Sequence, residues 1–253
     1  MIENIKSDAA HAITILRCRS NLKLTKQYRC DETGYVKKRG FDQAKYFDVT
    51  VAQVEDIRAL SRLLQELECS PDTCVIRGVI KEGCSREHVT RRLENFDDAP
   101  RSWLAIDIDD IPTPNHIDAL EEPETAVEYV IGLLPPEFHN VSCHYQFSSS
   151  FGTEGLLDEG EPGQAIKLHL WFMLDRPCTC EELKRWAKHV NRQAGYKLVD
   201  DSLYNPVQIH YTANPIFDGV FDPVSVRSGM LEQDEDTVVI EIPSDEERLS
   251  SGA

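Results

Sequence analysis

The sequence lacks the signatures of several protein classes. No apolar run in its 253 residues approaches the ~20 residues that a membrane-spanning helix needs. It has no Gly-x4-Gly-Lys-Ser/Thr loop, which argues against an ATP-driven helicase of the P-loop type. Its eight cysteines include no C-x2-C pair at zinc spacing, so they fit free thiols in a reducing compartment. The N-terminus has neither the basic region nor the apolar core of a signal peptide, and we therefore expect a cytoplasmic protein without a membrane partner.

Charge is distributed unevenly along the chain. The net charge of −17 at first argues against nucleic acid as a partner. However, residues 17–45 include nine basic and three acidic side chains, whereas residues 231–248 include eight acidic and one basic. A basic N-terminal region and an acidic C-terminal region are compatible with a groove that faces DNA, although a solvated basic surface would have the same composition. We expect residues 231–253 to be an acidic tail or linker.

The most informative stretch is 102–112, which reads SWLAIDIDDIP. Apolar residues alternate with other residues over six positions, which predicts a half-buried strand whose two faces differ. Asp107 and Asp109 share one face, at a spacing from which two carboxylates can converge on one or two divalent cations. A solvated outer face would alternate in the same way. By the same alternation Asp110 belongs to the apolar face, so we expect it to lie outside the site.

The other segments alternate between strand-like and helix-like patterns, which predicts a mixed α+β fold. Strand-like runs cover 12–16, 46–51, 74–80, 141–147, 167–174, 196–199 and 237–242. Helix-like segments cover 50–67, 85–96, 122–134 and 179–194. Thr50 with Gln53, and Thr179 with Glu182, have the spacing of capping boxes at helix starts.

Two other segments carry polar groups that suit the same face. Lys167 and His169 alternate with apolar residues on a long strand, which sets a polar cleft against a core. A lone histidine on an apolar strand is more often an ordinary core residue, but this one shares its face with a lysine. Ser148 and Ser150 lie in a polar turn, and Asp200 follows an apolar run. Three carboxylates suffice for two Mg²⁺ or Mn²⁺ ions, and the lysine, histidine and serines can contact phosphates.

At these motifs the chain resembles the archaeo-eukaryotic primase superfamily, in the primase-polymerase branch of phages, plasmids and other mobile elements. The matching residues are, in order, Ile106-Asp107-Ile108-Asp109, Lys167-Leu168-His169 and Val199-Asp200. The family usually has serine or a small residue where this chain has Lys167, so the role of Lys167 departs from the family pattern. The resemblance covers about residues 70–220.

The resemblance implies an RRM-like catalytic sheet at about 99–230, preceded by an N-terminal α/β subdomain at about 1–98. It also implies a DNA primase or DNA polymerase that performs two-metal, template-directed nucleotidyl transfer. The partners would be single-stranded DNA template and primer and nucleoside triphosphates, and relatives often have a helicase region or subunit as well. The catalytic ligands of Mg²⁺ or Mn²⁺ would be Asp107, Asp109 and Asp200. The nucleotide contacts would be His169, Lys167, Ser148 and Ser150.

Four more residues are candidates for contacts with nucleotide or template. Arg77 interrupts an apolar run, so it either reaches into a polar cleft or lies at a strand edge. Arg92 is placed on the expected helix 85–96, where an exposed surface is the simpler explanation. Gln208 and His210 follow the last motif and would lie near the cleft, although an ordinary loop fits equally well.

Two other functional classes fit parts of the sequence. A rolling-circle replication initiator nuclease also uses a sheet with metal-binding residues. That class requires two histidines that flank one apolar residue, together with a tyrosine nucleophile, and this chain has Lys167 in place of the first histidine. A catalytically inactive nucleic-acid-binding partner of a helicase is the other alternative, and the acidic composition favours it slightly.

Overall fold

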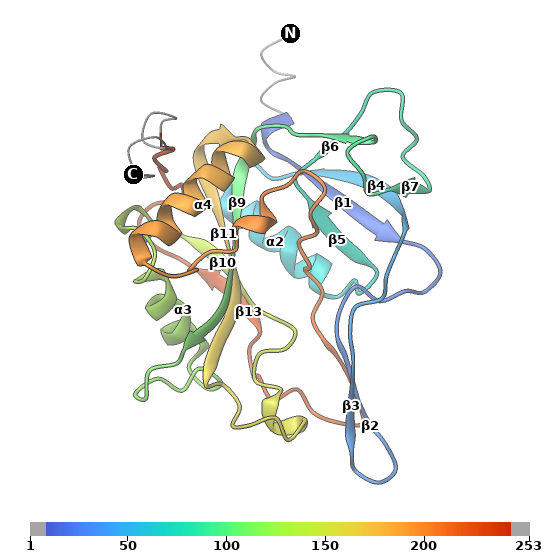
Figure 1. Cartoon of the computed structure of the whole chain (residues 1–253), viewed down its shortest axis with the longest axis vertical. Helices are drawn as coiled ribbons and strands as arrows, with labels where there is room; N and C mark the ends of the chain where they lie inside the picture. The colour runs from blue at the N-terminus through green and yellow to red at the C-terminus, as the bar shows by residue number, and fades with distance from the viewer. Residues whose placement is uncertain (1–8, 244–253) are drawn as a thin grey trace.

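Two four-stranded sheets organise residues 9–243, the part of the chain that the computed structural model describes (Figure 1). The first sheet has the order β5-β1-β4-β7, and the second has the order β13-β10-β11-β9. The strands of the first are β1 (Ala12–Cys18), β4 (Tyr46–Gln53), β5 (Thr73–Ile76) and β7 (Val89–Thr90). Those of the second are β9 (Arg101–Pro112), β10 (Cys143–Phe147), β11 (Ala165–Cys178) and β13 (Ser228–Leu231).

Two smaller sheets complete the architecture. One joins β12 (Ile216–Asp218) to the hairpin of β2 (Gln27–Cys30) and β3 (Val36–Arg39). The other pairs β6 (Val79–Ile80) with β8 (Phe96–Asp97). The mixed α+β class with several antiparallel sheets is therefore confirmed, whereas the RRM-like detail and the division near residue 98 stay predictions.

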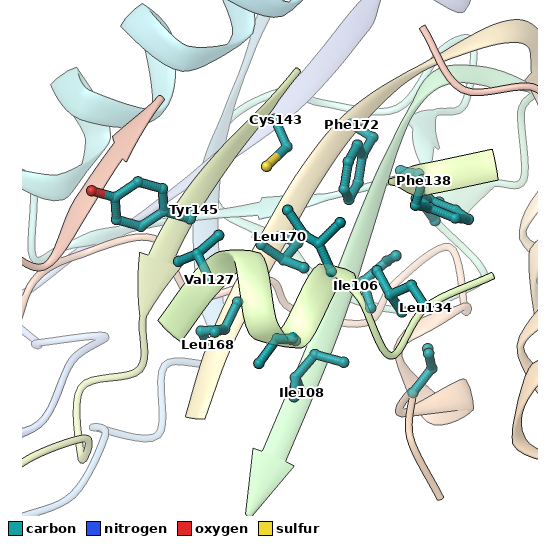
Figure 2. Packing of buried hydrophobic residues seen from close by; sticks show 14 of the residues in the cluster. Ile106, Ile108, Val127, Leu134, Phe138, Cys143, Tyr145, Leu168, Leu170 and Phe172 are labelled. Carbon is teal, nitrogen blue, oxygen red and sulfur yellow. The ribbon is translucent and has the colours of Figure 1, made fainter. Parts of the chain in front are cut away.

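The second sheet contains a split β–α–β unit, in which β11 lies between β9 and β10 and is antiparallel to both. Helix α3 (Pro123–Ile131) joins β9 to β10, and helix α4 (Cys180–Ala194) follows β11. Both helices pack on one face of the sheet, in a core that includes Val127 and Trp186. Figure 2 shows the apolar side chains of β9 and β11 on this face, directed toward α3. They include Ile106, Ile108, Leu168 and Leu170.

The opposite face of the same sheet has an apolar part at one end of the strands and a polar part farther along them. At one end, Trp103 and Trp171 pack against helix α2 (Ile57–Glu68), with their ring centroids 5.6 Å apart. Farther along the strands the same face carries Asp107 and His169, whose side chains are about one-fifth exposed. Alternation along β9 as far as Ile108, and along the facing part of β11, therefore produces a core on one side and a polar, solvent-reaching region on the other.

Helix α4 confirms its sequence prediction, whereas helix α2 begins later than expected. Thr179 and Glu182 form the capping box of α4, and Gly195 ends the helix with a φ of 77°. For α2, the cap is Asp56, whose side chain accepts a hydrogen bond from Ala59 N at 2.6 Å. The expected capping box at residues 50–53 is wrong, because those residues continue strand β4.

Three other local predictions are corrected by the structure. Residues 85–96 form no helix; they contain β7 and a turn in which the Asn95 side chain bonds Thr90 O at 2.9 Å. The expected strand 74–80 breaks between β5 and β6, where Gly78 N donates to Pro206 O at 2.8 Å. Residues 196–199 form no strand, although Val199 is fully buried.

The acidic region packs on the second sheet as far as the structure describes it. Leu174 and Val238 form an isolated parallel bridge in place of the expected strand 237–242. Val238 and Ile240 are buried in the core of this sheet. Residues 244–253 of the expected tail lie outside the described part. None of the helices within residues 9–243 is long and apolar enough to cross a membrane.

Candidate active site

The candidate site begins with a row of side chains across three strands. His169 on β11 lies directly opposite Asp107 on β9, and opposite Gln146 on β10. The Nε2 atom of His169 is 3.2 Å from Oδ1 of Asp107. The Gln146 amide donates to Thr212 O at 2.6 Å, which fixes that end of the row. The pairing register of the sheet therefore brings the first two motifs together.

Asp200 reaches the same place without the predicted strand. Its backbone N–H donates to the carbonyl of Asp107 at 3.1 Å. The side-chain oxygen of Asn191, in α4, accepts bonds of 2.8 Å from the backbone N–H groups of Leu198 and Val199. Asp200 then caps a 3₁₀ turn, η3 (Asp201–Leu203), and forms an ion pair of 2.9 Å with Lys197. The third acidic residue thus lies next to the first.

A β-bulge places Asp109 and Asp110 on the same side of the sheet. Ile108 and Ile111 are both in the core although they are three residues apart, so two residues of β9 lie opposite Lys167 alone. Asp110 has a φ of 58°, in the left-handed region. Its Oδ1 is 3.1 Å from the Lys167 ammonium, and its side chain is 74% exposed. The expectation that Asp110 belongs to the apolar face is therefore wrong, because the bulge interrupts the alternation.

The acidic groups and His169 shift one another's pKa values. Burial alone would raise the pKa of Asp107, but the adjacent His169 more than offsets it, so this pKa is lowered. Burial likewise opposes the charged form of His169, yet attraction to Asp107 and Asp109 raises the pKa of the imidazole. The pKa of Asp109 is raised by burial and then by the charge of Asp107. Burial and the neighbouring carboxylate therefore both disfavour the charged form of Asp109.

The carboxylates suit a hard cation by chemistry but are not assembled as a metal cluster. Among residues 9–243, no group of three or more His, Cys, Asp or Glu side chains is arranged to hold a metal ion. Asp107 faces His169, and Asp200 faces Lys197. Carboxylate oxygens are nevertheless the ligands that Mg²⁺ takes in proteins. The donor set fits such an ion, provided that these side chains reorient.

The serine turn lies beside Lys167. Ser148 N donates to Lys167 O at 2.8 Å, and the hydroxyls of Ser148 and Ser150 are 3.3 Å apart. Arg227 stabilises the turn, because its guanidinium donates to Ser148 O at 3.0 Å and also forms an ion pair of 2.6 Å with Asp222. The structure therefore brings Ser148 and Ser150 to the edge of the region that contains Lys167.

The four further candidates lie in different surroundings. Arg77 is fully buried and donates to the carbonyls of Trp103 and Cys178, so it lies neither in a cleft nor at an exposed edge. His210 is buried with its ring 5.7 Å from that of Trp103. Burial lowers the pKa of His210 to about 3.

Arg92 and Gln208 lie on loops. Arg92 is exposed between β7 and β8, with Glu94 at 3.9 Å. Gln208 follows η3, and its backbone N–H donates to Asn205 O at 3.0 Å. Contacts of either residue with nucleotide or template stay predictions.

Lys26 and Lys197 are charged neighbours of the site that the motifs did not identify. Lys197 is bonded to Asp200, and the charge of Lys26 acts on both His169 and Asp109. The only sequence signal for Lys26 is the basic composition of residues 17–45, which does not indicate where a given lysine lies.

Comparisons with known proteins found similarities to two phage proteins. No protein-family model matches the chain. It is similar to a putative replication origin binding protein of Escherichia phage T5, with 25% identity over 192 residues, which is 72% of this chain and 20% of that protein. The chain thus spans about a fifth of the length of the curated relative that it matches. Among solved structures it is similar to the AEP domain of the cyanophage S-2L primase-polymerase, at 9% identity and a TM-score of 0.35, over 92% of this chain and 86% of that one.

Proposed function

We propose that this chain is the catalytic domain of a primase-polymerase that serves DNA replication in a phage or another mobile element. The observation that carries the proposal is the meeting of Asp107, Asp109, His169 and Asp200 in one region of one sheet face. These residues come from three segments that are distant in the sequence. Strand pairing places His169 opposite Asp107, and the hydrogen bond from Asp200 N to Asp107 O joins the third segment to the first. Their order along the chain also matches the three motifs of the primase family.

In this proposal Asp107, Asp109 and Asp200 would hold Mg²⁺ or Mn²⁺. The bound ions would activate the attacking hydroxyl and balance the charge of the triphosphate. Lys167 and His169 bring hydrogen-bond donors to the same face, and the raised pKa of His169 favours its charged form. Charge-assisted hydrogen bonds to phosphate oxygens are among the strong ones. The buried sheet beneath them fixes these groups in place, which is what electrostatic stabilisation of a phosphoryl group requires.

The proposed reaction is template-directed nucleotidyl transfer. The 3′-hydroxyl oxygen of a primer bonds to the α-phosphorus of a nucleoside triphosphate, the bond to the bridging oxygen breaks, and pyrophosphate leaves. Single-stranded DNA template and primer would be the nucleic-acid partners. A helicase partner stays a prediction.

Primer extension with the purified chain tests the proposal. Incorporation of labelled nucleotide on a primed single-stranded template should require Mg²⁺ or Mn²⁺ and should be lost in the double variant Asp107→Asn with Asp109→Asn. Asp175→Asn is the matched control, because Asp175 is exposed at the other end of the strand that carries His169. A double variant that incorporates nucleotide as well as the control does would refute the proposal. A wild-type chain that binds the primed template but incorporates nothing would indicate a binding module instead.

A further inference from the structure

The hairpin of β2 and β3 carries Tyr28 and Lys38 on one face and Lys37 on the other. Tyr28 on β2 lies directly opposite Lys38 on β3, and residues directly opposite each other project to the same face of a sheet. Lys26 comes two residues before Tyr28, and its carbonyl accepts a bond of 3.0 Å from Ile216 N beside β2. Since side chains alternate with period two, Lys26 shares the face of Tyr28 and Lys38. Lys37 belongs to the opposite face.

This face is fixed to the loop that joins β10 to β11. The Tyr28 hydroxyl donates to Ser149 O at 2.9 Å and accepts a bond of 3.2 Å from Thr153. The Lys38 ammonium lies 3.4 Å from the carboxylate of Glu159, which belongs to the same loop. Figure 1 shows this loop running from the lower end of the second sheet toward the hairpin. Because Ser148 N is bonded to Lys167 O in that sheet, the hairpin lies beside the candidate active site.

The charges of Lys38 and Lys167 act on Lys26 on this side of the site, although each of these two lysines also has a carboxylate partner, Glu159 at 3.4 Å and Asp110 at 3.1 Å. Lys26 is half-buried, with its ammonium 5.7 Å from the centre of the Phe41 ring. Its pKa is lowered by burial, then by the charges of Lys38 and Lys167, and attraction to Asp109 offsets this only in part. Mutual repulsion of ammonium groups in a half-buried position is relieved when an anion with several charges binds between them.

We propose that Lys26 and Lys38 of the hairpin, together with Lys167, form a wall of the nucleotide site that binds the terminal phosphates of the triphosphate. This inference rests on the proposed function and adds to it the N-terminal hairpin, which carries none of the three motifs. A compact polyphosphate, whose oxygens can accept bonds from several ammonium groups at once, suits Lys26 together with the two lysines whose charges act on it. An extended DNA backbone would suit the outer face better, where Lys37 is 69% exposed.

Binding of inorganic tripolyphosphate without metal tests this wall directly, by titration calorimetry on the whole chain. Lys26→Gln should raise the dissociation constant about tenfold. A charge-assisted hydrogen bond to phosphate contributes roughly 1.5 kcal/mol, and about 1.4 kcal/mol corresponds to a tenfold change in affinity. Adding Lys38→Gln should raise it further. Lys37→Gln should change the dissociation constant less than about twofold, because Lys37 projects to the opposite face of the hairpin. Lys26→Arg keeps the charge and should retain most of the affinity.

The possible results separate this inference from the proposed function. Equal affinities for Lys26→Gln and Lys37→Gln, with unchanged melting temperatures, would overturn the phosphate wall. Loss of affinity for a labelled single-stranded DNA in Lys26→Gln, with unchanged affinity for tripolyphosphate, would also overturn it and assign Lys26 to nucleic acid. If tripolyphosphate binding depends on Lys26 but the wild-type chain extends no primer, the wall stands and the polymerase proposal fails.

Discussion

His169 and Asp107 face each other across the pairing of β11 with β9, with Nε2 of the imidazole 3.2 Å from Oδ1 of the carboxylate. Each partner favours the charged form of the other, since the pKa of His169 is raised and that of Asp107 is lowered despite burial. The pairing therefore favours the charged forms of both side chains at the centre of the candidate site.

Replacing His169 should weaken catalysis without unfolding the chain. We expect His169→Gln to lower kcat/KM for nucleotide incorporation by roughly 10²-fold, because removing one preorganised donor to a developing charge has effects of this order. Steady-state primer extension measures it. His116→Gln is the control, since His116 is exposed in the connection that follows β9. An activity of His169→Gln equal to that of the control would assign His169 a structural role only.

The bulge at Asp110 should tolerate only residues that accept a left-handed backbone. Asp110 has a φ of 58°, so Asp110→Val should lower the free energy of unfolding by roughly 1–2 kcal/mol. Asp110→Asn also removes the ion pair with Lys167, but should change stability by less than about 1 kcal/mol because that pair is exposed. Urea denaturation compares the two variants. Equal losses in both would mean that the ion pair, and not the backbone conformation, determines the effect.

Arg77 should prove to be a structural residue. Its guanidinium donates to the carbonyls of Trp103 and Cys178 and lies 4.7 Å from the centre of the Trp103 ring. Arg77→Met leaves these buried carbonyls without a donor, so we expect the free energy of unfolding to fall by roughly 2–4 kcal/mol. Denaturant unfolding measures this loss. A variant of wild-type stability whose KM for nucleotide is increased would show instead that Arg77 contacts the substrate.

His210 should make stability fall in acid. Its pKa drops from 6.5 in the unfolded chain to about 3 in the folded one, because burial disfavours the charged ring. Between these values the unfolded chain binds more protons than the folded chain, so the free energy of unfolding decreases as the pH is lowered. From pH 7 to pH 5 this contribution amounts to about 2 kcal/mol.

The variant His210→Phe isolates that contribution. It removes the titrating group and keeps an aromatic ring beside Trp103 and Trp171. Thermal unfolding of both proteins across this pH range should show a smaller acid loss in the variant. Parallel profiles would show that His210 does not titrate in the expected direction.

Local patterns in the sequence determined much of the second sheet. Period-two alternation placed Asp107 and Asp109 on one face of a strand and His169 on the matching face of another. A capping box and a terminal glycine defined helix α4 at both ends. These features were predictable because each depends on contacts between residues that are close in the chain, where side-chain direction follows from backbone geometry alone.

Only the tertiary structure decided which of these groups meet. Asp200 lies beside Asp107 because Asn191 of α4 holds the backbone that precedes it, not because it ends a strand. The bulge at Asp110 arises from the register between β9 and β11, and strict alternation cannot reveal an inserted residue. Lys26 comes to the site because Tyr28 bonds a loop more than a hundred residues away. Each of these outcomes depends on contacts between distant segments, which a reading of local pattern does not contain.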